Sequence, residues 1–201
     1  MRKKKFPVVS VVEPSSKAVF LDRDGTVNAL TPGEYILNSR DIRLLPGTAK
    51  AIRKLNRLGY LVIIITNQGT IGRGVLTEKK LDEIHAIMIR RLARKGAKID
   101  AVYHCPHHPR AILPGHAIKC ACRKPNAGMI LNALRHFAID KKKSFLIGDA
   151  TYDILAGKRA RIRTILVKTG YGGKDGKHDV KPDFIAKNLL DAVKFIHTDK
   201  N

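Results

Sequence analysis

At 201 residues the chain is long enough to bury a substantial core as one domain, and it has no uninterrupted apolar run of the length that crosses a membrane. Its formal net charge of +22 would suit nucleic acid, an anionic membrane or a small phosphorylated molecule as partner. The basic residues are spread along the chain and aromatic residues make up only 5%, so we expect general surface charge, with nucleic acid as the weaker alternative and no membrane partner.

The first 16 residues differ in character from the rest. They begin with the basic run Met1-Arg-Lys-Lys-Lys5, and the short apolar stretch that follows is broken by Pro7 and has no clear cleavage site. All three cysteines lie between Cys105 and Cys122, which does not fit a secreted disulfide framework. We therefore predict a basic, poorly ordered tail at 1–16 and a single domain at 17–201, in a cytoplasmic, monomeric protein.

The first half of the chain alternates apolar runs with amphipathic segments. Hydrophobic periodicity predicts strands at 18–21, 61–65 and 99–103, and helices at 48–58 and 77–95. Gly59 favours the left-handed backbone that ends a helix, and Thr77 is a suitable N-cap for the second helix. Residues 27–46, between the first strand and the first helix, are predicted to form an irregular flap.

The second half continues the alternation after a loop rich in Cys, His and Pro at 104–126. Hydrophobic periodicity in this half predicts strands at 144–147, 164–167 and 184–185, and helices at 127–137, 151–160 and 188–197. In the first of these helices the inward face is assigned to Ile130, Leu131, Leu134 and Phe137. Such alternation implies βαβ units, and thus a three-layer, Rossmann-like α/β fold with a mostly parallel sheet and no room for a cap domain.

Polar signals follow the predicted strands at their carboxyl ends. The residues that carry these signals are Asp22, Asp24, Thr66, Asp149 and Asp153, and the long loop adds Lys124. Because the carboxyl ends of parallel strands meet at one edge of a sheet, we expect one shared site. Grouped carboxylates need a cation such as Mg²⁺, while a lysine and a hydroxyl suit a phosphate. Each motif alone could be an ordinary turn or cap, but together they predict magnesium-dependent phosphoryl transfer.

The aspartates have distinct expected roles. A carboxylate such as Asp22 can attack phosphorus and become an aspartyl phosphate. Asp24 is placed to protonate the leaving oxygen and later to activate water. Asp149 and Asp153 share a helix face at (i, i+4) and can help to hold the cation.

The long loop carries a second candidate metal site, for zinc. Cys105, Cys120 and Cys122 supply three soft ligands in two close groups, which suits a tetrahedral structural Zn²⁺ site within residues 104–123. His107 is the preferred fourth ligand, and the competing histidines are His104, His108 and His116.

These motifs together resemble the haloacid dehalogenase superfamily of phosphohydrolases over about 19–172. The resemblance implies that Asp22 is the nucleophile and Asp24 the general acid and base. It also implies that Mg²⁺ is held by the carboxylates of Asp22 and Asp149 and the main-chain oxygen of Asp24, with Asp153 as a further metal acid. Thr66 and Lys124 would stabilise charge on the transferred phosphoryl group.

The zinc loop and the segment Thr169-Gly-Tyr-Gly172 look like those of the heptose bisphosphate phosphatases, whose nearest relatives are histidinol-phosphate phosphatases. This resemblance implies a small phosphorylated sugar as substrate, contacted by Asn28, Asn67, Gln68, Arg123 and Lys124. Two departures are Ala150, where a lysine or arginine is usual, and Gly69-Thr70, where Ser-Gly is usual. The alternatives are histidinol phosphate, a terminal phosphate of nucleic acid, or a non-enzymatic, zinc-stabilised binding protein.

Overall fold

A computed structural model describes residues 16–29 and 34–198 of the chain. Apart from Ser16, the tail predicted at 1–16 lies outside these residues. One sheet organises the described part, with six strands: β1 (Lys17–Leu21), β2 (Tyr60–Asn67), β3 (Ala101–Cys105), β4 (Phe145–Gly148), β5 (Arg163–Val167) and β6 (Phe184–Ala186).

All neighbouring strands run parallel, in the order β3-β2-β1-β4-β5-β6. The chain moves outward from β1 through β2 to β3, crosses back to β4 beside β1, and then moves to the opposite edge. The two directions part between β1 and β4. In open α/β sheets such a switch point leaves a crevice beyond the carboxyl ends of the strands, where ligands bind.

Strand β1 shows why these apolar runs form the centre of the sheet. Val19 and Leu21 pack into the core on one face, and Ala18 and Phe20 pack into the core on the other, all with no exposed surface. A strand buried on both faces reads as a continuous apolar run, which is typical of parallel sheets covered by helices on both sides.

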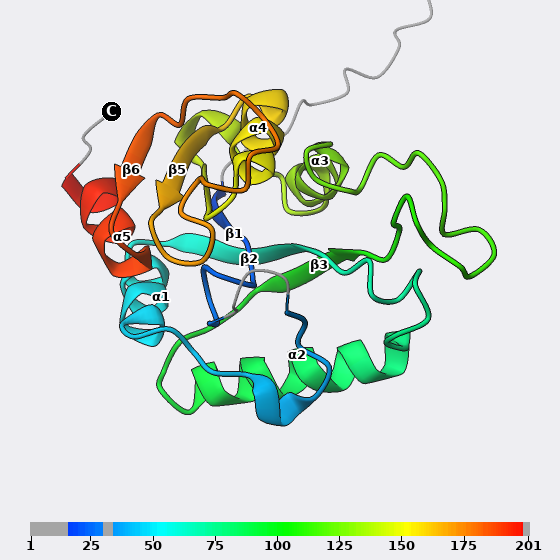
Figure 1. Ribbon diagram of the computed structural model, residues 1–201. Helices are drawn as coiled ribbons and strands as arrows, with labels where there is room; N and C mark the ends of the chain where they lie inside the picture. Colours follow the sequence, from blue (N-terminus) through cyan, green and yellow to red (C-terminus); the bar gives the residue numbers. More distant parts are fainter. Residues whose placement is uncertain (1–15, 30–33, 199–201) are drawn as a thin grey trace, which may run out of the picture.

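The helices form the two outer layers (Figure 1). They are α1 (Thr48–Arg57), α2 (Glu78–Ala93), α3 (Gly128–His136), α4 (Thr151–Ala160) and α5 (Leu189–Thr198). Ile52, Leu81 and Val193 place α1, α2 and α5 on one face of the sheet. Ile130 and Ala156 place α3 and α4 on the other. The predicted three-layer α/β fold is confirmed, and the sheet is parallel throughout its described strands.

Several details of the predicted elements are also confirmed. Gly59 adopts φ +77° after α1, and the Thr77 hydroxyl accepts a hydrogen bond from the backbone N–H of Lys80, at 3.2 Å, as the N-cap of α2. The inward position predicted for Leu131 was wrong, because its side chain is 46% exposed. In α3 the buried face runs through Met129, Ile130 and Ala133, and a helix turns Leu131 about 100° away from Ile130.

The flap predicted at 27–46 is described on both sides of residues 30–33. The backbone N–H of Ala29 donates to the carbonyl of Arg43 at 2.7 Å, and that of Leu45 donates to the carbonyl of Val27 at 3.1 Å, so the two ends of the flap lie side by side. The described part of the flap holds only one short 3₁₀ helix (Ser39–Asp41) and no cap domain.

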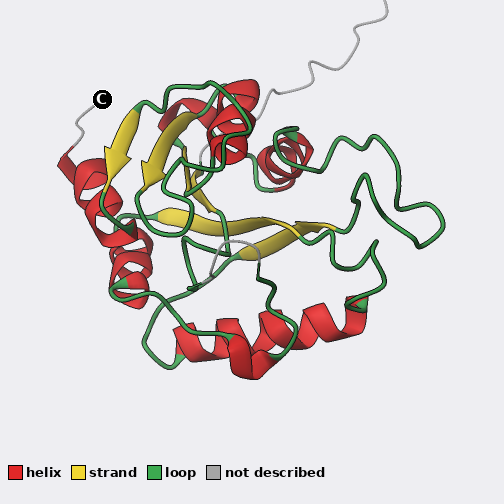
Figure 2. Ribbon diagram, in the orientation of Figure 1, coloured by secondary structure: helices red, strands yellow, loops and turns green. Residues whose placement is uncertain are grey.

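Between β3 and α3 the chain is loop throughout, as Figure 2 shows. Within the described ranges no helix has the length and apolar character needed to cross a bilayer.

Candidate active site

The strand ends bring the predicted catalytic residues together at the switch point. Asp22 follows β1, and its backbone N–H donates to the carbonyl of Ile147 in β4 at 2.9 Å, which fixes the start of the turn after β1. Thr66 lies near the end of β2, and Asp149 follows β4. All three side chains are nearly or fully buried. The parallel register therefore places a hydroxyl and carboxylates from three strands at one edge of the sheet.

A buried lysine lies among the carboxylates. The Lys124 ammonium donates to Asp22 Oδ1 at 2.5 Å and to the carbonyl of Ile65 at 2.9 Å, and it lies 2.7 Å from Asp153 Oδ1. Carboxylate oxygens of Asp22, Asp149 and Asp153 all lie within 4.8 Å of one another. Asp22 thus contacts the Lys124 ammonium and also belongs to the group of three carboxylates.

The charges of this cluster perturb the pKa values of its acids. Burial, opposed by Lys124 and reinforced by Asp153 and Asp24, raises the pKa of Asp22 to about 7. Burial, reinforced by Asp22 and Asp153, raises the pKa of Asp149 to about 9. Although burial alone would lower it, the carboxylates of Asp153 and Asp22 raise the pKa of Lys124. Burial and mutual repulsion therefore hold Asp22 and Asp149 toward their protonated forms unless a further cation offsets their charge.

The surroundings of Asp149 fit a cation-holding carboxylate. A Cβ added at Gly25 would lie 2.4 Å from Asp149 Oδ2, and one added at Gly170 would lie 2.1 Å from the same atom, so only glycine can occupy either position. Both glycines also have positive φ angles, +89° and +56°. The backbone N–H of Tyr171 donates to Asp149 Oδ2 at 2.7 Å. Three carboxylates gathered in this way are the hard oxygen ligands that Mg²⁺ prefers.

Asp24 has a different environment from Asp22. Its two oxygens accept hydrogen bonds from Arg23 at 2.8 and 2.6 Å, from the Asn28 amide at 3.0 Å and from the Gln68 amide at 3.1 Å. Burial pushes its pKa upward, but the Arg23 guanidinium and these hydrogen bonds outweigh burial and hold the pKa of Asp24 below its usual value. Two carboxyls two residues apart thus have opposite pKa shifts: Asp22 is held toward its protonated form and Asp24 toward its ionised form.

The side chains assigned to substrate contact are largely engaged with the protein. Asn67 exchanges two hydrogen bonds of 3.0 Å with the backbone of Lys124, through its amide nitrogen and its amide oxygen. Gln68 donates to Thr66 Oγ1 at 2.8 Å as well as to Asp24. The Asn67 amide thus ties the end of β2 to Lys124, and the Gln68 amide links Thr66 Oγ1 to Asp24 Oδ2. Arg123 donates to the carbonyl of His107 at 2.8 Å.

The four expected zinc ligands form a compact cluster. The Sγ atom of Cys105 lies 3.6 Å from that of Cys120 and 3.0 Å from that of Cys122, and His107 Nδ1 lies 3.5 Å from Cys105 Sγ and 3.2 Å from Cys122 Sγ. Sulfur ligands about 2.3 Å from a tetrahedral Zn²⁺ would be about 3.8 Å apart, so the cluster fits the metal with small adjustments. Of the competing histidines, none belongs to the cluster, and His104 pairs with Glu78 at 2.8 Å.

A cleft of about 270 Å³ is lined by Asp22 and Asp24. Besides the buried Arg23, its lining includes four cationic side chains, which we call the cationic rim: Arg73, Arg110, Arg123 and Lys177. Burial, together with these four charges, lowers the pKa of His108, which lines the same cleft. The positive field is therefore concentrated where a ligand would enter.

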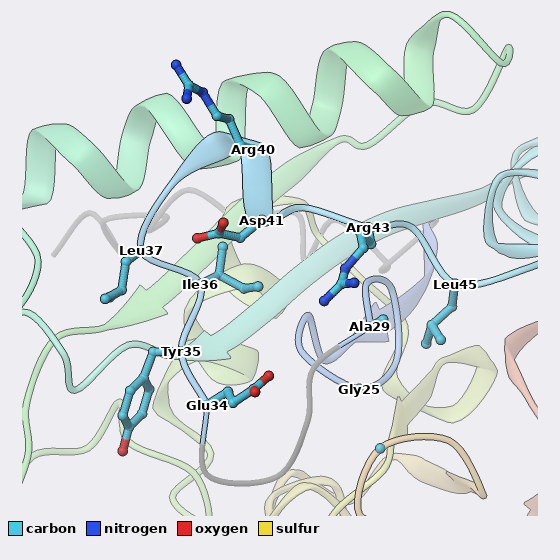
Figure 3. Close-up of a pocket in the computed structure, with 11 residues that line it drawn as sticks. Gly25, Ala29, Glu34, Tyr35, Ile36, Leu37, Arg40, Asp41, Arg43 and Leu45 are labelled. Carbon is cyan, nitrogen blue, oxygen red and sulfur yellow. The ribbon is translucent and has the colours of Figure 1, made fainter.

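A larger cavity of about 640 Å³ lies on the other side of the flap (Figure 3). Glu34, Tyr35 and Ile36 line both this cavity and the catalytic cleft, so this part of the flap separates the two. None of the catalytic carboxylates lines the cavity, which reaches their vicinity only at Gly25 and Gly170.

Sequence reasoning missed two residues of the site, Arg23 and His85. The Arg23 side chain is 1% exposed and contacts Asp24 and His85. The signal available was its position between the two aspartates, but an isolated arginine is usually exposed. His85 occupies a core position of α2, in the stripe with Leu81, Ile84 and Met88.

Comparison with known proteins identifies the relatives of this chain. A family model described as HAD-hydrolase-like matches residues 121–192. D-glycero-beta-D-manno-heptose-1,7-bisphosphate 7-phosphatase of Pasteurella multocida is 38% identical over 182 residues, covering 90% of this chain and 96% of the relative. The D-glycero-alpha-D-manno-heptose-1,7-bisphosphate 7-phosphatase of Photorhabdus laumondii is 42% identical over 181 residues, with coverage of 90% and 96%.

A solved structure agrees with these relatives. The D,D-heptose 1,7-bisphosphate phosphatase of B. bronchiseptica, complexed with magnesium and phosphate, superposes with a TM-score of 0.81 at 30% sequence identity, covering 91% of this chain and 99% of that chain. The likeness therefore extends over nearly the whole length of both proteins.

Proposed function

The chain belongs to the haloacid dehalogenase superfamily and is a phosphoric monoester hydrolase, and from this we propose that it removes the C7 phosphate of D-glycero-D-manno-heptose 1,7-bisphosphate. The observation that carries the choice of a bisphosphate is the cationic rim beside the catalytic aspartates. A substrate with two phosphates presents one to Asp22 and needs a positive surface for the other. Relatives named for the alpha and the beta anomer both match, so the proposal covers either anomer.

Two rim side chains support this reading. The Arg73 guanidinium lies over the Tyr35 ring at 4.5 Å, and its buried Nε has no hydrogen-bond partner among the described residues. The Lys177 ammonium lies over the Tyr152 ring at 4.9 Å. Both cations are held by an aromatic face rather than by a carboxylate, which leaves their N–H groups for a phosphate.

The proposed chemistry begins at Asp22. Its carboxylate attacks phosphorus, the bond to the C7 oxygen breaks, and a phosphoryl group is left on Asp22 as an aspartyl phosphate. Asp24 gives a proton to the leaving oxygen, then takes one from the water that hydrolyses the intermediate. Lys124 and Thr66 face the charge that develops on the phosphoryl oxygens. Mg²⁺, held by Asp22, Asp149, Asp153 and the main-chain oxygen of Asp24, would supply further neutralisation of phosphate charge when bound.

We predict that Mg²⁺ stabilises the fold more at pH 8 than at pH 5. A carboxyl whose folded pKa is raised from 3.8 to about 7, as in Asp22, contributes full stability below about pH 4 and loses it as the pH rises through 7. Asp149, with its pKa raised to about 9, acts in the same direction. The cation offsets this loss, so the Mg²⁺-induced rise in Tm should grow with pH. Equal rises at both pH values would contradict the assignment, and Asp149→Asn should shrink the rise at pH 8.

We further predict about one tightly bound zinc per chain, held by the cysteine and histidine cluster. Cys120→Ser should lose the zinc and raise KM as well as lower Tm, because Arg123 and the cluster share the contact with His107. Elemental analysis of protein purified without chelator measures the metal. His116→Ala, outside the cluster, is the matched control and should keep its zinc. Zinc-free wild-type protein would refute the site.

The substrate is tested by comparing kcat/KM for the heptose bisphosphate, histidinol phosphate and a 5′-phosphorylated oligonucleotide at physiological salt. The bisphosphate should be the best of the three. Arg73→Ala should raise KM for the bisphosphate by about 10- to 100-fold, the worth of one charge-assisted hydrogen bond, and leave KM for histidinol phosphate nearly unchanged. A better rate with either alternative would overturn the heptose assignment without affecting the Asp22 chemistry.

A further inference from the structure

The buried arginine between the two aspartates has donors in two directions. Arg23 directs Nε and Nη2 at the two oxygens of Asp24, at 2.8 and 2.6 Å, as a planar fork. On the far side of the guanidinium, Nη1 lies 3.0 Å from Nε2 of His85. A guanidinium bound at both ends cannot rotate without breaking one of these contacts. The orientation of the Asp24 carboxylate is therefore linked to a residue in α2.

The hydrogen bond between Arg23 and His85 requires one particular tautomer of the histidine ring. Arginine only donates, so Nε2 of His85 must accept the hydrogen bond and the ring proton must lie on Nδ1. Burial, with the charge of Arg23 and then His104 beside it, lowers the pKa of His85 to about 3, so the ring is neutral in the range where the enzyme is assayed. His85 itself is 6% exposed and does not line the catalytic cleft.

We propose that His85 is a positioning residue for the phosphatase reaction: it holds Arg23, which in turn orients the Asp24 carboxylate toward the leaving oxygen. Without an acceptor at this position, the Nη1 group of Arg23 would be buried and unpaired, and the guanidinium would turn to find another partner. Asp24 would then lose the two-point contact that sets the plane of its carboxylate and keep only the single hydrogen bonds from Asn28 and Gln68. Asp22, Lys124 and the metal-binding carboxylates would stay in place. The inference rests on the proposed acid–base role of Asp24.

The test compares His85→Leu with His85→Gln, using p-nitrophenyl phosphate and phenyl phosphate as substrates. Leucine fills the core but removes the acceptor, whereas the Gln oxygen can accept from Arg23. His85→Leu should lower kcat for phenyl phosphate by about 10- to 100-fold with KM nearly unchanged. The loss should be smaller for p-nitrophenyl phosphate, because its leaving group needs less help from an acid. His85→Gln should recover most of the activity.

Two further variants separate the possible failures. Met88→Ala, a fully buried change three residues further along the same helix that removes no hydrogen-bonding group, should lower Tm and leave kcat and its leaving-group dependence unchanged. Asp24→Asn should show the same dependence on leaving group as His85→Leu, more strongly. If Asp24→Asn lacks that dependence, the proposed role of Asp24 fails. If Asp24→Asn shows it and His85→Leu slows both substrates equally, raises KM alone, or is not rescued by Gln, the positioning role of His85 is wrong.

Discussion

Replacing Asp22 by asparagine should lower kcat by several orders of magnitude, on the order of 10⁴-fold or more, while the fold survives. Asparagine has nearly the same size as aspartate, and its amide oxygen can still accept the hydrogen bond of 2.5 Å from the Lys124 ammonium. What it loses is the negative oxygen that attacks phosphorus. Stability should not fall, because the substitution removes one of the crowded carboxylates that raise one another's pKa.

The measurement is phosphate release from p-nitrophenyl phosphate together with thermal unfolding. Asp82→Asn, an exposed aspartate on α2, is the matched control and should retain full activity. Activity close to that of wild type in a well-folded Asp22→Asn protein would rule out the aspartyl-phosphate mechanism. A variant that is inactive because it is unfolded would be recognised by its lost thermal transition, and Asp22→Ser would then replace it.

Replacing Lys124 by methionine should have the largest combined effect on stability and activity. Its side chain is 1% exposed, and its ammonium pairs with Asp22 and Asp153 at once. Removing one member of a buried ionic cluster leaves the others unpaired, which typically costs about 3–5 kcal/mol in the free energy of unfolding. The loss should be greatest without Mg²⁺ and at pH 8, which lies above the pKa of about 7 for Asp22, so that this carboxylate is ionised. Removal of a donor that faces the phosphoryl group should also lower kcat by about 10²–10³-fold.

A surface ion pair of the same chemistry provides the control. Lys158 pairs with Asp183 where the two side chains are 38% and 41% exposed. Because water and salt screen such pairs, Lys158→Met should change the free energy of unfolding by less than about 1 kcal/mol and leave kcat unchanged. Chemical denaturation of both variants makes the comparison. Similar losses for the two lysines would contradict the role assigned to the buried cluster.

The fold could be predicted from the sequence because hydrophobic periodicity carries most of it. The errors in strand boundaries lie at the polar ends of β2 and β3. Strand β2 was expected to stop at Ile65, but it continues through Thr66 and Asn67, which pair with His104 and Cys105 in β3. For the same reason β3 lies two residues later than expected. Backbone pairing with a neighbouring strand overrides the polar character of these residues, and a single segment of sequence does not contain that information.

The sequence could predict which residues gather at the site, but not the hydrogen bonds between their side chains. Strand ends indicated where Asp22, Thr66 and Asp149 would meet, since that depends on topology alone. The partners of the amide side chains depend on the direction of each side chain. Sequence reasoning could therefore not show that the Asn67 amide holds the backbone of Lys124 at both atoms. Arg23 was missed for a related reason, because its burial depends on acceptors that lie 1 and 62 residues away.

The loop at 104–123 separates the residues of the proposed active site into two groups along the sequence. Asp22, Asp24 and Thr66 precede its tip at Gly115, where an added Cβ would meet no atom within 4 Å, while Lys124 and Asp149 follow it. The cluster of cysteines and histidine is divided in the same way, with Cys105 and His107 before the tip and Cys120 and Cys122 after it. A single proteolytic nick there would produce two fragments, each with only part of the proposed site, that stay paired along β1 and β4. With the proposed zinc bound, the fragments would also share that ion, and reassembly of such a split enzyme would depend on it.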